Sequence, residues 1–403
     1  MGIGRFDPMD TTAPTEPAPS RRAGVWASTM AGHESDVASV RRAHGDSSAD
    51  VAPGAVRDRL AREEAEDATL VPGATRALGA GNRARDETPD PHRTCFERDR
   101  DRILHGATAF RRLAGKTQVF IFPEDHQRTR LTHALEVAQV ATSVARACGL
   151  NVALTEAIAL GHDCGHGPGG HASEDAFSPY LSQGYDHAVW GADVVLAPLN
   201  LCIETLDGIR NHSWSRPAPA TPEGEVVSWA DRIAYVCHDF EDAVHTGIVT
   251  ADMLPPLVRE RCGETRSAQL GAFIGAMVSA IAGTGVVGMA ADHAAALAEF
   301  RRFNYEHIYM RPASVAQGDV VIRVLRALVD FYADRPNTLP LDGLDDAGGS
   351  TPRRRGVAAG TEDAVREAVA YVAGMTDRYA FTMAIEHLGW DRTALPMGID
   401  WRR

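Results

Sequence analysis

Apolar residues recur at steps of three and four along the chain from Thr94 onward, and this periodicity constrains the fold more than any other feature. The spacing is that of an amphipathic helix, whereas a half-buried strand would alternate every second residue. Segment 131–148 shows it most clearly, with a seam of small residues: Leu131, Ala134, Leu135, Ala138, Ala141, Ala145 and Cys148. No alternation of strand and helix patterns follows, so the parallel-sheet nucleotide folds are disfavoured and we expect an all-α fold.

Capping residues and glycines bound the other expected helices. The helix after segment 131–148 runs from Val152 to His162, where a glycine-rich stretch stops it. Further helices are expected at 186–197, 200–212, 226–246, 267–282, 289–303, 313–334 and 361–388. A short extended piece is expected only from Val119 to Phe122.

The first 90 residues differ in composition from the rest of the chain. They are rich in Ala, Arg, Asp, Pro and Ser, and Phe6 and Trp26 are their only aromatic residues. So little apolar surface cannot offset the entropy of ordering, so we expect a largely disordered extension with one short helix at 56–68. A start codon assigned too far upstream is the alternative. Residues 91–403 would form the folded domain, with a core at 128–245, C-terminal helices at 246–403 and a flexible insertion at 341–360.

Composition narrows the classes of function. The formal net charge of -13 argues against a broad grip on nucleic acid. No run of 18 to 20 apolar residues predicts a membrane helix, and the N-terminus lacks a secretory signal, so we expect a cytoplasmic protein. The six cysteines form no CxxC pair, which indicates reduced thiols. Lys116 is the only lysine.

The segment GHDCGHGPGGH at 161–171 is the densest cluster of chemically active residues. Adjacent His162 and Asp163 would point about 100° apart on a regular helix, so both reach one ion only where the helix ends. The glycines that follow allow that turn. His133 lies off the apolar seam of its helix and is available as a third ligand.

Asp231 is the expected fourth ligand. It begins a polar stripe on one helical face, formed by Asp231, Tyr235, Asp239 and Asp242. Two imidazoles and two carboxylates suit Mn, Fe, Co, Ni or Mg with open coordination positions better than a closed zinc site. Such an ion polarises a phosphoryl oxygen and activates water. A histidine patch on the surface of a helical protein is the alternative.

Six blocks of sequence resemble one known family. They are ERDRDRILHGATAFRRLAGKTQVF, RTRLTHALEVAQVA, GHDCGHGPGGHASE, DRIAYVCHDFEDAV, FNYEHIYMRP and YVAGMTDRYA, in that order between residues 97 and 380. The chain resembles the HD-domain deoxynucleoside triphosphate triphosphohydrolases, the dGTPase-like proteins, over about residues 91 to 390. The resemblance implies an all-α HD-domain fold with a single metal site and hydrolysis of a deoxynucleoside triphosphate to a deoxynucleoside and inorganic triphosphate.

The resemblance also implies roles for individual residues. His133, His162, Asp163 and Asp231 match the metal ligands. His171 matches the catalytic histidine and Glu174 the acid that orients it, although a helix N-terminal carboxylate is the alternative for Glu174. The expected catalytic set is therefore His171, Glu174 and His166. The expected substrate contacts are Arg130, Gln118, His187, Arg232, Tyr235, Asp239 and Tyr305.

Within that set, His166 and His187 face the phosphates and Arg130 binds the phosphate next to the metal. Arg232, Tyr235 and Asp239 lie near the phosphates and sugar. Gln118 reads the 3′-hydroxyl, and Tyr305 crowds the deoxyribose or, alternatively, is a core aromatic. For Lys116 a structural role and a phosphate contact both remain open.

Two positions depart from the family pattern. The family has Pro-Phe-Gly-His where this chain has Pro168-Gly169-Gly170-His171, so an aromatic residue that packs the catalytic loop is absent. Ala188 stands where Asn commonly follows the histidine. Both bear on substrate preference and rate and leave the ligands unchanged.

Other functions stay open. An HD nucleotidase or phosphoesterase acting on another nucleotide would share the metal core, and a nucleotide-binding sensor would hydrolyse weakly or only when activated. The expected partners are a deoxynucleoside triphosphate, a regulatory nucleotide and further copies of the chain as a homo-oligomer. The expected cofactor is a divalent cation, Mn, Mg, Fe or Co.

Overall fold

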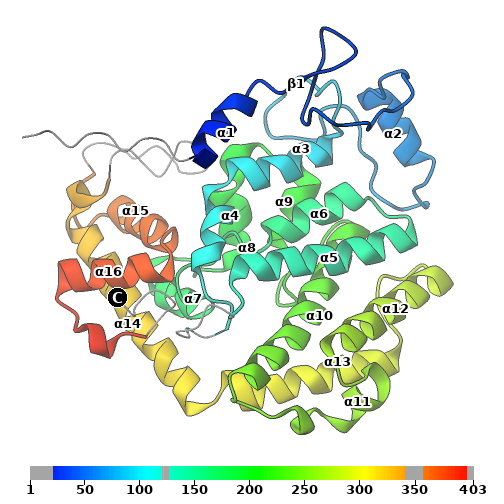
Figure 1. Ribbon diagram of the computed structural model, residues 1–403. Helices are drawn as coiled ribbons and strands as arrows, with labels where there is room; N and C mark the ends of the chain where they lie inside the picture. Colours follow the sequence, from blue (N-terminus) through cyan, green and yellow to red (C-terminus); the bar gives the residue numbers. More distant parts are fainter. Residues whose placement is uncertain (1–20, 120, 122–126, 341–356, 397–403) are drawn as a thin grey trace, which may run out of the picture. The chain divides into compact units, whose positions relative to one another are not determined.

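The computed structural model describes residues 21–119, 121, 127–340 and 357–396. The chain divides into a small unit that ends at Val56 and a large unit that begins at Arg57. In the small unit, α1 (Arg21–Thr29) precedes β1 (His33–Glu34) and β2 (Arg41–Arg42), two short antiparallel strands. The large unit is helical throughout its described residues apart from two isolated bridges (Figure 1). The expected all-α class is confirmed.

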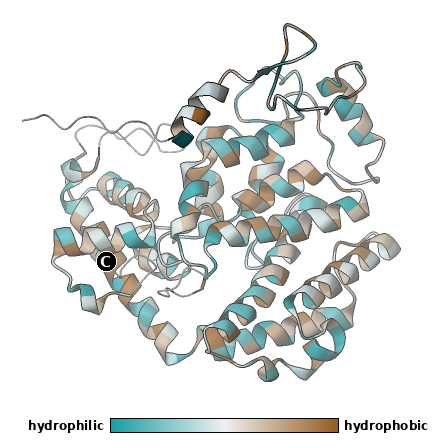
Figure 2. Ribbon diagram, in the orientation of Figure 1, coloured by the Kyte–Doolittle hydropathy of each residue, from teal (hydrophilic) through white to brown (hydrophobic). Residues whose placement is uncertain are grey.

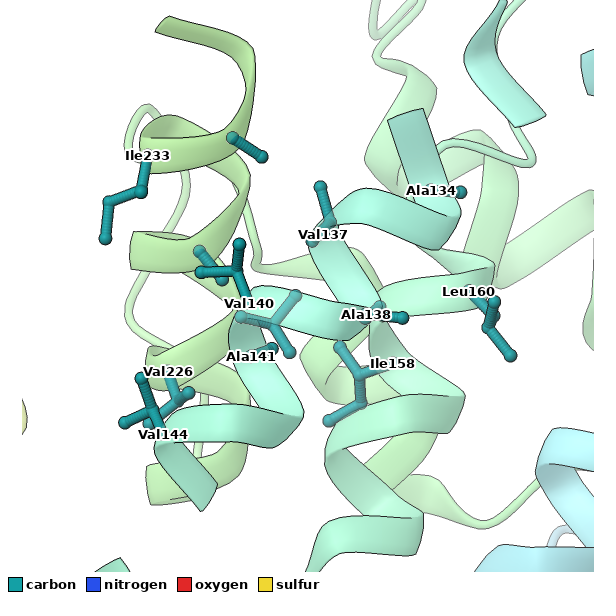
Figure 3. Packing of buried hydrophobic residues seen from close by; sticks show 14 of the residues in the cluster. Ala134, Val137, Ala138, Val140, Ala141, Val144, Ile158, Leu160, Val226 and Ile233 are labelled. Carbon is teal, nitrogen blue, oxygen red and sulfur yellow. The ribbon is translucent and has the colours of Figure 1, made fainter. Parts of the chain in front are cut away.

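Three helices pack together at the centre of the large unit: α5 (Arg130–Cys148), α6 (Val152–Gly161) and α10 (Pro222–His245). Small side chains on α5, such as Ala138 and Ala141, allow the helices to approach closely. Figure 3 shows Val140 and Val144 of α5 on the side that faces α10. The seam predicted at 131–148 is therefore the core of the protein.

Short helices surround this core. They are α2 (Arg59–Asp67), α3 (Cys95–Asp101), α4 (Thr108–Arg112), α7 (Ala172–Phe177), α8 (His187–Trp190) and α9 (Ile203–Arg210). The expected helix at 186–197 is α8 followed by a π-helical segment, Gly191–Val195. The helix expected at 56–68 is present as α2.

A second apolar cluster lies around α14 (Pro312–Asp334), α15 (Glu362–Ala373) and α16 (Asp377–Leu388). The single helix expected at 361–388 is two helices, because the chain turns at Gly374 and the Thr376 hydroxyl caps the first turn of α16. Of the expected extended piece, Phe120 and Phe122 lie outside the described residues, and so does most of the expected insertion at 341–360.

The third group consists of α11 (Pro256–Cys262), α12 (Arg266–Thr284) and α13 (Ala291–Asn304). Hydrophobic and hydrophilic residues share the long helices, as the periodicity predicts (Figure 2). By length and composition alone, α12 is apolar enough to cross a membrane, in contrast to the sequence expectation. Its Phe273 and Met277 are nevertheless buried in the main core, and it contacts α5 and α10.

The expected boundary near residue 90 is wrong. Residues from Arg57 onward belong to the large unit. The Arg83 guanidinium forms a fully buried ion pair with Asp99 at 2.6 Å and also donates to the Asn200 carbonyl. Glu223 on α10 accepts hydrogen bonds from the Thr75 backbone and hydroxyl. Polar contacts therefore order this segment, which apolar composition could not reveal.

We expect Asp99→Ala to lower the free energy of unfolding by about 3–5 kcal/mol, because it leaves the Arg83 charge buried and unpaired. Urea denaturation would measure the loss. The matched control is Asp67→Ala, which breaks the exposed pair with Arg76 and should cost under about 1 kcal/mol. Equal losses for the two variants would contradict the structural role of the buried pair.

Candidate metal centre

The structure brings the four expected ligands together from three elements. His133 lies on α5, His162 and Asp163 follow the end of α6, and Asp231 lies on α10. The His133 Nε2 is 3.0 Å from the Asp231 Oδ1, and the His162 Nε2 is 3.7 Å from the same oxygen. The His162 Nε2 is also 3.4 Å from the Asp163 Oδ1. Donor atoms at these separations can surround a single cation.

His162 is prepared to bind a cation. Its Nδ1 donates to the Ala159 carbonyl at 2.6 Å, which leaves the lone pair on Nε2. The ring is fully buried, and Nε2 has no hydrogen-bond partner. A buried nitrogen without a partner is costly, and a divalent cation would satisfy it. The donor set fits the expected cation.

Asp163 is ionised at the centre of the cluster. Its Oδ2 accepts from the buried Arg130 at 2.6 Å, and its Oδ1 lies 3.2 Å from the His166 Nε2. Burial would raise the pKa of Asp163, but His162, Arg130 and His166 hold it well below its usual range. One carboxylate oxygen is therefore fixed by Arg130, and the other faces the histidines.

The glycine-rich loop after Asp163 is closely packed. A Cβ on Gly165 would lie 2.0 Å from the His187 carbonyl oxygen. Gly169 has φ +70°, and its amide donates to Asp377 of α16 at 2.8 Å. Lys116 is buried and donates to the carbonyls of His166 and Ala373. Lys116 therefore has a structural role here, and its burial lowers its pKa to about 7.

Three histidines of the expected site lie beside the loop. The His166 and His187 rings stack with centroids 3.7 Å apart, and the His171 ring lies edge-on to both. The His171 ring reaches solvent, yet protein atoms surround much of it. Desolvation and the nearby Arg130 charge lower the pKa of His171 to about 4. His171 is therefore neutral at pH 7 and accessible to a ligand.

The expected partner of Glu174 is wrong. Its carboxylate accepts from the His187 Nδ1 at 2.5 Å and from the His187 amide at 3.0 Å, in place of a bond to His171. Burial would raise the pKa of Glu174, but the bond from His187 lowers it to about 2. Glu174 therefore orients His187, and the sequence spacing of three residues from His171 was misleading.

Comparison with known proteins agrees with this geometry. Residues 130–236 match the HD domain, and residues 287–385 match the phosphohydrolase-associated domain. A deoxyguanosinetriphosphate triphosphohydrolase-like protein from Caldanaerobacter subterraneus is 39% identical over 79% of this chain and 92% of its own. One from Desulfatibacillum aliphaticivorans is 36% identical over 81% and 96%.

The chain belongs to the HD-domain phosphohydrolases of the dGTPase-like family. Among solved structures, a phosphohydrolase from Bacteroides thetaiotaomicron aligns at 17% identity and a TM-score of 0.42, covering 71% of this chain and 68% of that one. In this HD phosphohydrolase, the family match spans the four ligands as well as α14 to α16.

The remaining expected substrate residues lie along α10 and its neighbours. The Arg232 guanidinium lies 3.6 Å over the Trp214 ring, and the Tyr235 hydroxyl accepts from Arg301 at 2.8 Å. The Gln118 carbonyl oxygen is 3.3 Å from the Arg130 Nη2, which places that residue beside the centre. Tyr305 is half exposed and starts the π-helical segment Tyr305–Tyr309.

Sequence reasoning missed two residues of this HD phosphohydrolase. The Tyr309 hydroxyl donates to Asp239 at 2.5 Å, so Tyr309 and not Tyr305 reaches the polar stripe of α10. His212 is buried, and its Nε2 lies 3.3 Å from the His187 Nε2. A signal for His212 existed in the sequence: His212 follows a helix end as His162 does.

We expect Gly165→Ala to destabilise the protein by about 2 kcal/mol or more, because the added methyl group would overlap the His187 carbonyl. Thermal unfolding would measure the loss. Gly271→Ala in α12 is the matched control, since nothing lies within 4 Å of its added Cβ. The control should gain up to about 1 kcal/mol. A Gly165→Ala protein as stable as the parent would contradict the tight packing of the loop.

Asp239 predicts a pH dependence of stability. Burial raises its pKa to about 7, above the value of about 4 in an unfolded chain. The folded state therefore holds more protons between these values, and stability falls as pH rises from 4 to 7. We expect Asp239→Asn to remove at least about 1 kcal/mol of this loss, measured as unfolding free energies at pH 5 and pH 8.

Tyr309→Phe is the opposing control for Asp239. Removing its hydroxyl takes away a hydrogen bond that lowers the pKa of Asp239, so the loss of stability should extend to higher pH. Identical pH profiles in the parent, Asp239→Asn and Tyr309→Phe would disprove this assignment.

Proposed function

We propose that this protein hydrolyses deoxynucleoside triphosphates, dGTP or several of them, to a deoxynucleoside and inorganic triphosphate, with a divalent cation as cofactor. The observation that carries the proposal is the convergence of His133, His162, Asp163 and Asp231 around the orphaned His162 Nε2. The names of the relatives give the substrate class. The donor set fits Mn, Mg, Fe or Co.

The protein's own groups supply charge and position. When bound, the cation polarises a phosphoryl oxygen and activates a water molecule. Arg130 lies against Asp163 and stabilises the negative charge of the adjacent phosphate. Gln118 lies beside Arg130 and reads the sugar, while Arg232, Tyr235, Asp239 and Tyr305 form the more distant wall.

His171 handles the proton at the leaving oxygen. It is accessible and neutral in the free site. A neighbouring phosphate dianion favours the imidazolium, which can then donate its proton to the 5′ oxygen as the ester bond breaks. His166 lies beside it with both ring nitrogens unpartnered by hydrogen bonds and can contact the phosphates. Glu174 acts through His187.

Two partners belong to the same proposal. The family resemblance favours a homo-oligomer and a regulatory nucleotide, and the acidic net charge disfavours nucleic acid as substrate. A cytoplasmic location would place the enzyme with its nucleotide substrates.

We expect Asp163→Ala to lose at least about 100-fold of turnover in a screen of the four dNTPs and GTP with Mn or Mg, because a lost ligand costs more than a lost supporting contact. Product analysis should find intact triphosphate in the parent reaction. Asp292→Ala, on exposed α13, is the control that should keep full activity. Orthophosphate as the only inorganic product would indicate a different nucleotidase. Nucleotide-dependent melting shifts without turnover would indicate a sensor.

A further inference from the structure

His212 is built in the same way as the metal ligand His162. Each ring follows a helix end and donates its Nδ1 to the carbonyl three residues earlier, His162 to Ala159 at 2.6 Å and His212 to Ile209 at 2.8 Å. A carbonyl oxygen only accepts hydrogen bonds, so the lone pair of each ring is on Nε2. Both rings are buried. His212 therefore presents a fixed nitrogen donor to the cluster.

His187 presents a second donor to the same point. Its Nδ1 is bonded to the Glu174 carboxylate at 2.5 Å, and its Nε2 lies 3.3 Å from the His212 Nε2. With both Nδ1 atoms protonated, two neutral rings direct lone pairs at each other without a hydrogen between them. A carboxylate behind a histidine is the usual support of a metal-bound imidazole. A cation between the rings would remove the repulsion.

Asp163 completes this group of donors. Its Oδ1 lies 3.8 Å from the His187 Nε2, and ligand atoms of His162, Asp163 and His212 lie within 4.8 Å of one another. Donors about 2.1 Å from one ion and 90° to 110° apart are separated by about 3.0 to 3.4 Å. The separation of the two histidine nitrogens falls in that range, and the carboxylate requires only a small movement.

We propose that this protein holds a second divalent cation between His187 and His212, with the Asp163 carboxylate shared between the two ions. The inference rests on the proposed function for the first ion and deepens it. The second ion would bring positive charge to the place where the family resemblance puts His187 against the phosphates. Two ions sharing one carboxylate are suited to clamp a phosphoryl group.

A rival group of donors does not fit. His166, His171 and His187 also have ligand atoms within 4.8 Å of one another. The rings of His166 and His187 are stacked at an interplanar angle of 17°, however, so their in-plane lone pairs run side by side and do not converge on one ion. This group also lacks a carboxylate. His166 and His171 therefore remain available for substrate.

The test counts metal ions in the nucleotide-free protein. Metal-stripped full-length protein is saturated with Mn²⁺, the bound ions are counted after dialysis, and the low-temperature electron paramagnetic resonance spectrum is recorded. We expect two ions per chain and the spectrum of a magnetically coupled pair. One ion per chain at saturation, with the spectrum of an isolated ion, overturns the proposal and indicates that a proton joins the two rings.

Paired variants locate the second ion. His212→Ala should lose one ion and the coupled signal but keep the other ion, whereas His171→Ala should keep both. The reverse result places the ion in the rival group and overturns the assignment. Melting curves check that each variant is folded, and the parent count decides the matter if His212→Ala does not fold. Because no nucleotide is present, failure of the proposed substrate would leave these results unchanged.

Discussion

The buried Asp163 carboxylate is the constraint on which the site depends. A carboxylate without water is stable only when paired, and here one oxygen is held by Arg130 while the other faces three histidines. Since Arg130 begins α5 and Asp163 follows α6, the ion pair fixes the relation of the two central helices. The small residues that pack α5 against α6 and α10 are what allow these groups to meet.

The C-terminal helices belong to the same construction. Asp377 of α16 accepts from Gly169 and from the Thr117 backbone, and Lys116 donates to a loop carbonyl and to Ala373 of α15. The segment matching the phosphohydrolase-associated domain therefore holds the loop of the HD domain in place. This explains the position of the only lysine: its three hydrogens serve backbone carbonyls that lack other partners nearby.

Sequence reasoning reached the helices and the four ligands because both follow local rules, periodicity and helix ends. It failed where partners are distant in sequence. Glu174 was paired with His171 by spacing, but the turn between α7 and α8 brings His187 to it instead. The boundary at residue 90 was inferred from apolar content, whereas Arg83 is held by buried polar contacts. His212 carried no motif of its own, although its position at a helix end repeated that of His162.

The departure from Pro-Phe-Gly-His has a structural explanation. Gly169 adopts a left-handed conformation, and a Cβ there would lie 2.4 Å from Val321 of α14. A side chain at this position would therefore meet both backbone strain and a filled space. Val321 occupies the volume beside the loop that an aromatic residue could otherwise fill, and Asp377 anchors the loop amide. Packing that the family obtains from within the loop is supplied here from α14 and α16, which keeps His171 beside the metal ligands without the aromatic ring.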